Sequence, residues 1–203
     1  MRLILAAALV LASAASVAQT PTTPPGKPDP ALATAGAYKL DPDHTQVLFT
    51  VNHLGFSEYT GQFTQPSGTM TLDPGNSSAA KVSVSFPIAK ISTTVAAIGE
   101  HLKEPDFFDA AKFPTGTFVS TKVAASGTNA TITGDLTLKG VTKPVTLQAR
   151  FVGAGPGPQG AHKTNIGFHA TTSISRSDFG ISYGVPMVSD RVDLVINAAF
   201  EAE

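Results

Sequence analysis

The chain has 203 residues, of which 14 are Lys or Arg and 15 are Asp or Glu, so its formal net charge is −1. A nucleic-acid surface needs clustered basic side chains that displace counterions from phosphates, and the chain has no basic run. It has no cysteine either, which excludes thiolate nucleophiles and iron–sulfur clusters.

Residues 1–18 have the pattern of a secretory signal peptide. Arg2 supplies a positive charge, residues 3–11 are uncharged and apolar, and Ser16 to Ala18 place small residues before a cleavage site. The apolar run is too short to cross roughly 30 Å of hydrocarbon. We therefore expect cleavage before Gln19 and a periplasmic protein that does not span the membrane.

Residues 19–36 are rich in proline. Proline fixes φ and lacks an amide donor, so we expect a disordered, extended linker here. Residues 37–203 then have the length of one domain.

From Thr45 onward, apolar and polar residues alternate in successive runs, a pattern that predicts strands with one face toward an apolar interior. Turn-forming stretches at 73–76, 126–129, 139–140 and 153–160 separate the runs. The spacing predicts an all-β domain of about eight strands of roughly 8–11 residues, arranged as a barrel or a sandwich.

Residues 93–113 interrupt the alternation. Val95, Ile98 and Leu102 have helical spacing, Thr93 or Thr94 could cap the helix start, and Pro105 ends the run. A single helical insertion of this kind is well placed to close one end of a barrel.

Four ordered blocks carry a family resemblance. They are residues 41–68 with His44, Phe49, His53 and Gly61; residues 101–118 with Phe107-Phe108-Asp109; residues 134–145; and residues 176–192 with Arg176-Ser177-Asp178-Phe179-Gly180. In these blocks the chain resembles the YceI-like periplasmic proteins. The resemblance implies an eight-stranded antiparallel lipocalin-like β-barrel with one helical insertion. It also implies a long isoprenoid-type ligand, a polyprenyl chain or an isoprenoid quinone, held inside the barrel for carriage or storage.

The inward-facing residues support a channel. Many are small, as at Ala149, Ala170, Thr172 and Ala198, and small residues opposite large ones leave space. The residues expected to line this channel are Phe49, Val51, Phe86, Leu102, Phe107, Phe108, Phe118, Phe151, Phe168 and Phe179. His101, Arg176 and Asp178 are expected to meet a polar head group at the rim. Family members commonly carry an arginine directly before the His-Leu pair, where this chain has Gly99 and Glu100; the head-group preference is therefore open.

Other motifs give weaker indications. Gly180 to Gly184 matches G-x-S-x-G, but Pro186 follows where a nucleophile elbow needs a helix. Gly155 to Gly160 matches the dinucleotide fingerprint, but it contains prolines and strand spacing resumes after it. The five histidines show no ligand spacing.

We therefore expect a protein that is not an enzyme and has neither metal nor cofactor. Its expected partners are the apolar lipid and, transiently, a membrane surface; nucleic acid is not expected, and a homodimer is left open. Two alternatives remain: an exported β-barrel stress or interaction protein with no bound lipid, and a serine esterase acting through Ser182.

Overall fold

The computed structural model describes residues 23–157 and 163–203, so the signal peptide expected at residues 1–18 lies outside the described residues. The strands are β1 (Gly36–Leu40), β2 (Gln46–His53), β3 (Ser57–Phe63), β4 (Ser67–Leu72), β5 (Lys81–Pro87), β6 (Ile91–Thr93), β7 (Thr115–Ser126), β8 (Asn129–Leu138), β9 (Val141–Pro156), β10 (Thr164–Ser175) and β11 (Arg191–Ala202). The helices are α1 (Ala96–His101) and the 3-10 helices η1 (Pro30–Leu32), η2 (Pro74–Ala79), η3 (Ile88–Lys90) and η4 (Arg176–Phe179).

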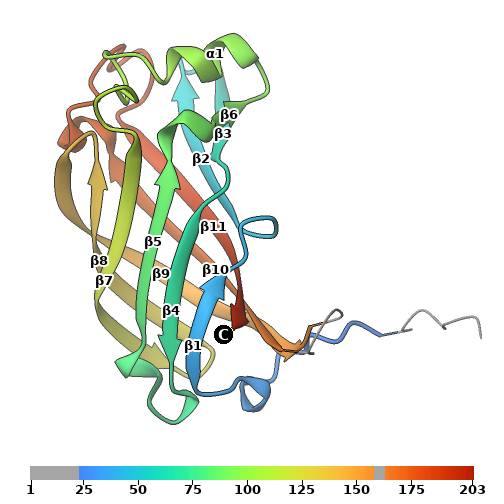
Figure 1. Ribbon diagram of the computed structural model, residues 1–203. Helices are drawn as coiled ribbons and strands as arrows, with labels where there is room; N and C mark the ends of the chain where they lie inside the picture. Colours follow the sequence, from blue (N-terminus) through green and yellow to red (C-terminus); the bar gives the residue numbers. More distant parts are fainter. Residues whose placement is uncertain (1–22, 158–162) are drawn as a thin grey trace, which may run out of the picture.

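The strands close into a barrel. The order β1-β4-β5-β7-β8-β9-β10-β11 returns to its start because β11 also pairs with β1, and each of these pairings is antiparallel. Toward the α1 end, the wall is extended by β2, β3 and β6, which follow β1, β4 and β5 there. β2 pairs with a part of β11 farther from its end than β1 does. The result is a closed eight-strand antiparallel barrel with α1 at one end and β1 at the other, as Figure 1 shows, and it confirms the predicted fold class.

Alternation along the strands separates the interior from the outer face. On β10, Ile166 and Ala170 are buried, and the side chain of the intervening His169 bonds to Asn197 of β11 at 2.9 Å. The buried apolar residues form two clusters inside the wall. The first, near α1, includes Phe49, Phe63, Phe86, Phe118, Leu136 and Phe179; the second, near β1, includes Tyr38, Leu40, Met70, Ile166 and Phe200.

Several strands are longer than the sequence predicted. β9 has 16 residues and continues through Gly153 to Pro156, part of the stretch expected to be a loop. This region is held on both sides, because β10 pairs with it and Lys27 exchanges two backbone hydrogen bonds of 3.0 Å with Ala154. The described part of the proline-rich segment thus contacts the barrel, which differs from the expected disordered linker.

The helical insertion lies where the sequence predicted it, but its α-helix is shorter than expected. We call residues 94–114, between β6 and β7, the lid segment; it contains α1 and a series of turns. The predicted threonine cap is wrong, because the N-cap is Val95 and has no side-chain cap bond. Thr93 is the last residue of β6 and pairs with Gly61 of β3. Its hydroxyl donates to the Val95 carbonyl at 2.7 Å.

Candidate functional site

A cavity of about 630 Å³ lies inside the barrel. Its lining includes Ile98 and Leu102 at the α1 end and Pro30 and Ser77 at the opposite end, so it extends through both apolar clusters. Most of its wall consists of aliphatic and aromatic side chains. Its volume falls in the range of small-molecule sites. The alternative of a core filled by side chains does not describe this barrel.

All but one of the residues expected to line a channel line this cavity: Phe49, Val51, Phe86, Leu102, Phe107, Phe108, Phe118, Phe151 and Phe168. Phe179 does not. It is 1% exposed and packs inside the first apolar cluster from the 3-10 helix η4. The period of two that predicts inward residues on strands does not apply to a 3-10 helix.

Glycines keep the interior open. Three cavity-lining phenylalanines lie against a glycine of the neighbouring strand, so close that a Cβ on that glycine would overlap the ring. The distance from an ideal Cβ to the nearest ring carbon is 2.2 Å for Gly61 and Phe49, 2.2 Å for Gly116 and Phe86, and 2.4 Å for Gly134 and Phe118. At each of the three glycine positions, the Cβ of any other residue type would therefore overlap the space that the ring now fills.

Aromatic residues form the α1 end of the cavity. The ring of His101 lies 4.9 Å from that of Phe107 and 5.9 Å from that of Tyr183, and the last two are 5.3 Å apart. All three line the cavity. His101 thus lines the α1 end of the cavity, and its contact with a head group stays a prediction.

Tyr59 brings a polar atom to the same end. Its hydroxyl oxygen is buried, has no hydrogen-bond partner among the described residues, and belongs to a cavity-lining side chain. The pKa of Tyr59 is lowered, because the nearby hydroxyls of Thr93 and then Thr94 favour its ionised form. An unpartnered buried hydroxyl is costly, so it is a ready donor for a ligand oxygen.

Arg176 has a different role from the one predicted. It lines the cavity, but its guanidinium donates four hydrogen bonds of 2.8–3.1 Å to the carbonyls of Ile181, Tyr183, Val188 and Ser189. Burial lowers its pKa. We call residues 180–190, between η4 and β11, the closing loop. Arg176 holds this loop from within and has few donors left for a head group.

Asp178 was also expected at the rim, but the structure does not place it on the cavity. It is exposed in η4 and does not line the cavity. The neighbouring carboxylate of Asp190 instead accepts bonds of 2.8 Å from the amide and the hydroxyl of Ser177. These two bonds lower the pKa of Asp190.

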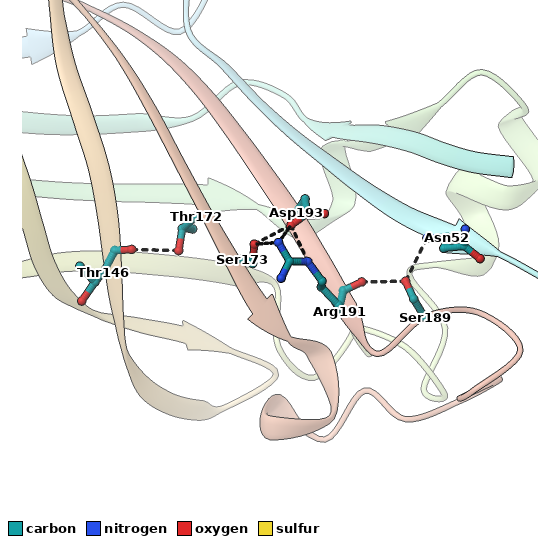
Figure 2. A network of polar contacts seen from close by, with 7 residues as sticks. All are labelled: Asn52, Thr146, Thr172, Ser173, Ser189, Arg191 and Asp193. Atoms are coloured by element: carbon teal, nitrogen blue, oxygen red, sulfur yellow. Dashed lines mark hydrogen bonds and ion pairs between the residues drawn. The ribbon is translucent and has the colours of Figure 1, made fainter. Parts of the chain in front are cut away.

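A polar network fixes the closing loop to the wall (Figure 2). The Ser189 hydroxyl accepts from the Asn52 amide of β2 at 2.9 Å and donates to the Arg191 carbonyl of β11 at 2.7 Å. Farther along, Arg191 donates to Asp193 and to Ser173 of β10. The loop therefore has a defined position beside the cavity mouth.

Lys139 connects the lid segment to the closing loop. It lies in the turn between β8 and β9, and its Nζ donates to the carbonyl of Pro105 at 2.8 Å and to that of Gly180 at 3.3 Å. This contact involves no strand hydrogen bond, but the lid segment is also held to the wall by the bond from the Ile88 amide to the Pro114 carbonyl at 2.9 Å and by the packing of Phe108 against Phe63.

The other motifs show no catalytic arrangement. Ser182 is exposed in a turn, and no helix follows it within the described chain up to β11. Part of the stretch 155–160, and His162, lie outside the described residues. Within residues 23–157 and 163–203, no three His, Asp or Glu side chains are grouped to hold a metal ion, and no helix is long and apolar enough to cross a membrane.

Sequence reasoning missed several cavity residues. Tyr59, His53 and Tyr183 all line the cavity. Tyr59 could have been found, because it shares one face of its strand with Gly61 and Phe63. Tyr183 lies in the closing loop, where no periodic signal exists.

Comparisons with known proteins agree with this architecture. A family model described as the YceI-like domain matches residues 38–200. Protein YceI of Escherichia coli O17:K52:H18 is 42% identical over 167 residues, which cover 81% of this chain and 86% of that protein. The crystal structure of Campylobacter jejuni YceI protein superimposes with a TM-score of 0.67 at 32% identity, over 75% of this chain and 90% of that one. A polyisoprenoid binding domain from Saccharophagus degradans, implicated in plant cell wall breakdown, shares the fold with a TM-score of 0.63 at 15% identity, over 82% of this chain and 98% of that one.

Proposed function

The chain belongs to the YceI-like family, and from this premise we propose that it binds a long apolar lipid of isoprenoid type in its barrel. The lipid, a polyprenyl chain or an isoprenoid quinone, is carried or stored rather than chemically changed. A structural neighbour is described as a polyisoprenoid binding domain, and that ligand class suits the interior found here.

The observation that carries the proposal is the continuous apolar cavity. A prenyl chain in water exposes many methylene and methyl groups, and each gains about 0.8 kcal/mol when it is buried. Part of this gain offsets the ordering of a flexible chain. A narrow tube lined by Phe49, Phe86 and Phe118, with aliphatic residues between them, provides such burial along its length.

A polar head group is best placed at the α1 end. The Tyr59 hydroxyl has no hydrogen-bond partner among the described residues, and the His101 imidazole also lines the cavity, against Phe107 and Tyr183. A carbonyl or hydroxyl oxygen of the ligand would accept from or donate to these groups. The prenyl tail would then extend toward the β1 end, where the second apolar cluster lines the cavity.

The protein acts without catalysis and outside the cytoplasm in this proposal. The exposed turn position of Ser182 supports the first part. The signal-peptide pattern of residues 1–18 supports the second.

Phe108→Asp tests the proposal. Phe108 lines the cavity and packs edge-on against Phe63 with 5.6 Å between ring centres. A carboxylate there would have to lose water when the tail is bound. We expect delipidated Phe108→Asp protein to bind a radiolabelled long-chain prenyl alcohol about tenfold or more weakly than the unchanged protein.

Val119→Asp is the matched control. Val119 is 47% exposed, lies on β7 and does not line the cavity. Its replacement should leave binding unchanged, and both variants should keep the β-type circular dichroism. Equal binding by folded Phe108→Asp and unchanged protein would contradict the proposed site.

A further inference from the structure

Exposed apolar side chains gather at the α1 end of the barrel. They come from three separate segments around the cavity mouth: the β2–β3 turn, the start of the lid segment and the closing loop. We call this set the apolar rim; it consists of Leu54, Phe56, Val95, Ile98, Tyr183, Val185 and Met187. Phe56 is 89% exposed and Met187 62%. Large apolar side chains exposed together indicate a surface for binding rather than a core.

Two of the three rim segments, the β2–β3 turn and the closing loop, are joined by hydrogen bonds. The Leu54 amide donates to the Met187 carbonyl at 2.8 Å, and His53 forms a bridge with Val188. The Ser189 hydroxyl joins the same two segments through Asn52, as Figure 2 shows. These bonds hold the backbones of the β2–β3 turn and the closing loop beside each other.

The backbone at the turn also favours a binding role. Leu54 has φ +58° and Gly55 has φ +73°, which places both residues in the left-handed region. Turns of this kind prefer Asn or Asp before the glycine, because a bulky side chain adopts this conformation at a cost. An exposed leucine kept in a strained conformation suggests that its apolar side chain is used.

The rim is continuous with the cavity. Ile98 and Tyr183 belong to the rim and also line the cavity, and Tyr183 contacts Phe107 of the lid segment. A lipid leaving the mouth would therefore meet the rim first. A rigid protein seated on this rim would close the mouth, whereas a fluid bilayer would leave a path for the lipid.

The charges around the rim favour an uncharged bilayer surface. The acidic residues of the lid segment are Glu100, Glu104, Asp106 and Asp109. Of the nearby lysines, Lys103 pairs with Glu100 at 2.7 Å, Lys112 lies over the Phe113 ring and Lys139 is bound to two carbonyls. Among the described residues of the rim segments and the lid segment, the cations that could attract anionic lipids are therefore few and already engaged. The burial of the rim's apolar side chains in the bilayer is therefore the interaction that would hold the protein there.

We propose that the apolar rim inserts into the surface of a lipid bilayer and that the bound lipid enters and leaves through the mouth between α1 and the closing loop. This inference rests on the proposed function, because a membrane lipid is what such docking would deliver. Docking is reversible, since short loop tips and no long helix enter the bilayer.

A tryptophan probe tests insertion directly. The chain contains no Trp, so Phe56→Trp provides a fluorescent group without background. With phosphatidylcholine vesicles, we expect its emission to shift to shorter wavelength and to be quenched by lipids brominated near the head group. Val119→Trp, at an exposed site on the barrel wall, should show neither effect. No change at position 56, or equal changes at both positions, would overturn the inference.

A transfer measurement separates docking from lipid binding. Phe56→Asp combined with Met187→Asp changes rim residues that do not line the cavity. Protein loaded with labelled prenyl alcohol from solution should keep it, but transfer to vesicles should slow by about tenfold or more. Loss of the loaded lipid by the double variant would show that the rim residues belong to the lipid-binding cavity. Unchanged transfer would show that the rim does not dock on the bilayer. Either result overturns the inference. If neither the variant nor the unchanged protein binds the alcohol, the proposed function fails instead.

Two further results would show that the apolar rim does not dock on an uncharged bilayer. Adding phosphatidylglycerol should not strengthen binding; a strong increase that salt abolishes would mean that charge, not the apolar rim, drives docking. Sedimentation should show the same oligomeric state for the unchanged protein and the double variant. A dimer that dissociates in the variant would assign the rim to a second copy of the chain.

Discussion

Adding one methyl group at Gly116 should narrow the cavity without placing any new atom in contact with the ligand. An ideal Cβ at Gly116 lies 2.2 Å from Cε2 of Phe86 and 3.0 Å from Cδ2 of Leu138. Carbon atoms in contact are about 3.5–4.0 Å apart, so the Phe86 ring must move by roughly 1.3–1.8 Å. The ring lines the cavity on its other side, and that is where it can move.

The displaced ring takes the place of about one or two methylene groups of the ligand. At about 0.8 kcal/mol each, Gly116→Ala should weaken binding of the prenyl alcohol by roughly 4- to 15-fold. If the ring cannot move, the strain appears instead as a loss of about 1–3 kcal/mol in the free energy of unfolding. Equilibrium binding and urea denaturation of the same preparation distinguish these two results.

Gly167→Ala is the matched control. It is also a strand glycine, but its nearest neighbours would lie 3.8 Å or more from a new Cβ, at ordinary contact distance. Phe86→Leu in the Gly116→Ala background should restore most of the affinity, because the ring that was displaced is gone. Full affinity in folded Gly116→Ala, or equal losses in both glycine variants, would refute the reasoning.

Three other predictions concern the segments around the mouth. Arg176→Met removes four bonds to carbonyls and should lower the free energy of unfolding in urea by roughly 3 kcal/mol; a loss below about 1 kcal/mol would contradict its role as the clamp of the closing loop. Lys139→Met frees the lid segment and should release bound lipid roughly fivefold faster in stopped-flow transfer, whereas an unchanged rate would mean that the contact does not limit opening. The lowered pKa of Asp190 gives stability that is present above its unfolded value near 3.8 and is lost as pH falls through the lower folded value. Urea midpoints should therefore fall more steeply below about pH 4 in the unchanged protein than in Asp190→Asn, and parallel curves would count against this linkage.

The barrel could be predicted from sequence because its strands alternate cleanly. Once a strand is recognised, the period of two decides which residues face inward, and Phe49, Phe118 and Phe168 lie on the cavity as expected. The closed order of the strands came from the family resemblance. Alternation alone left a sandwich equally open.

The expected site residues that the structure places differently lie outside the strands. Phe179 and Asp178 belong to a 3-10 helix, where one residue in three shares a direction and the strand pattern gives no guide. Arg176 was expected to bind a head group because it carries a charge near the mouth. Its partners are backbone carbonyls of the closing loop, and carbonyl positions are set by tertiary structure that no side-chain pattern encodes.

The apolar rim was also invisible in the sequence. Leu54 and Phe56 flank a glycine in a turn, and single apolar residues in turns are common. Only the barrel brings this turn beside the closing loop, 130 or so residues later in the chain, through the bond between Leu54 and Met187.

Mass spectrometry of an organic extract of the purified, unchanged protein tests the central claim most directly. An isoprenoid in the cavity predicts a species built of repeating five-carbon units, present in equimolar amount with the protein and depleted in Phe108→Asp protein prepared in the same way. An extract without lipid, or one that matches the bulk phospholipids of the cell in both preparations, would contradict it.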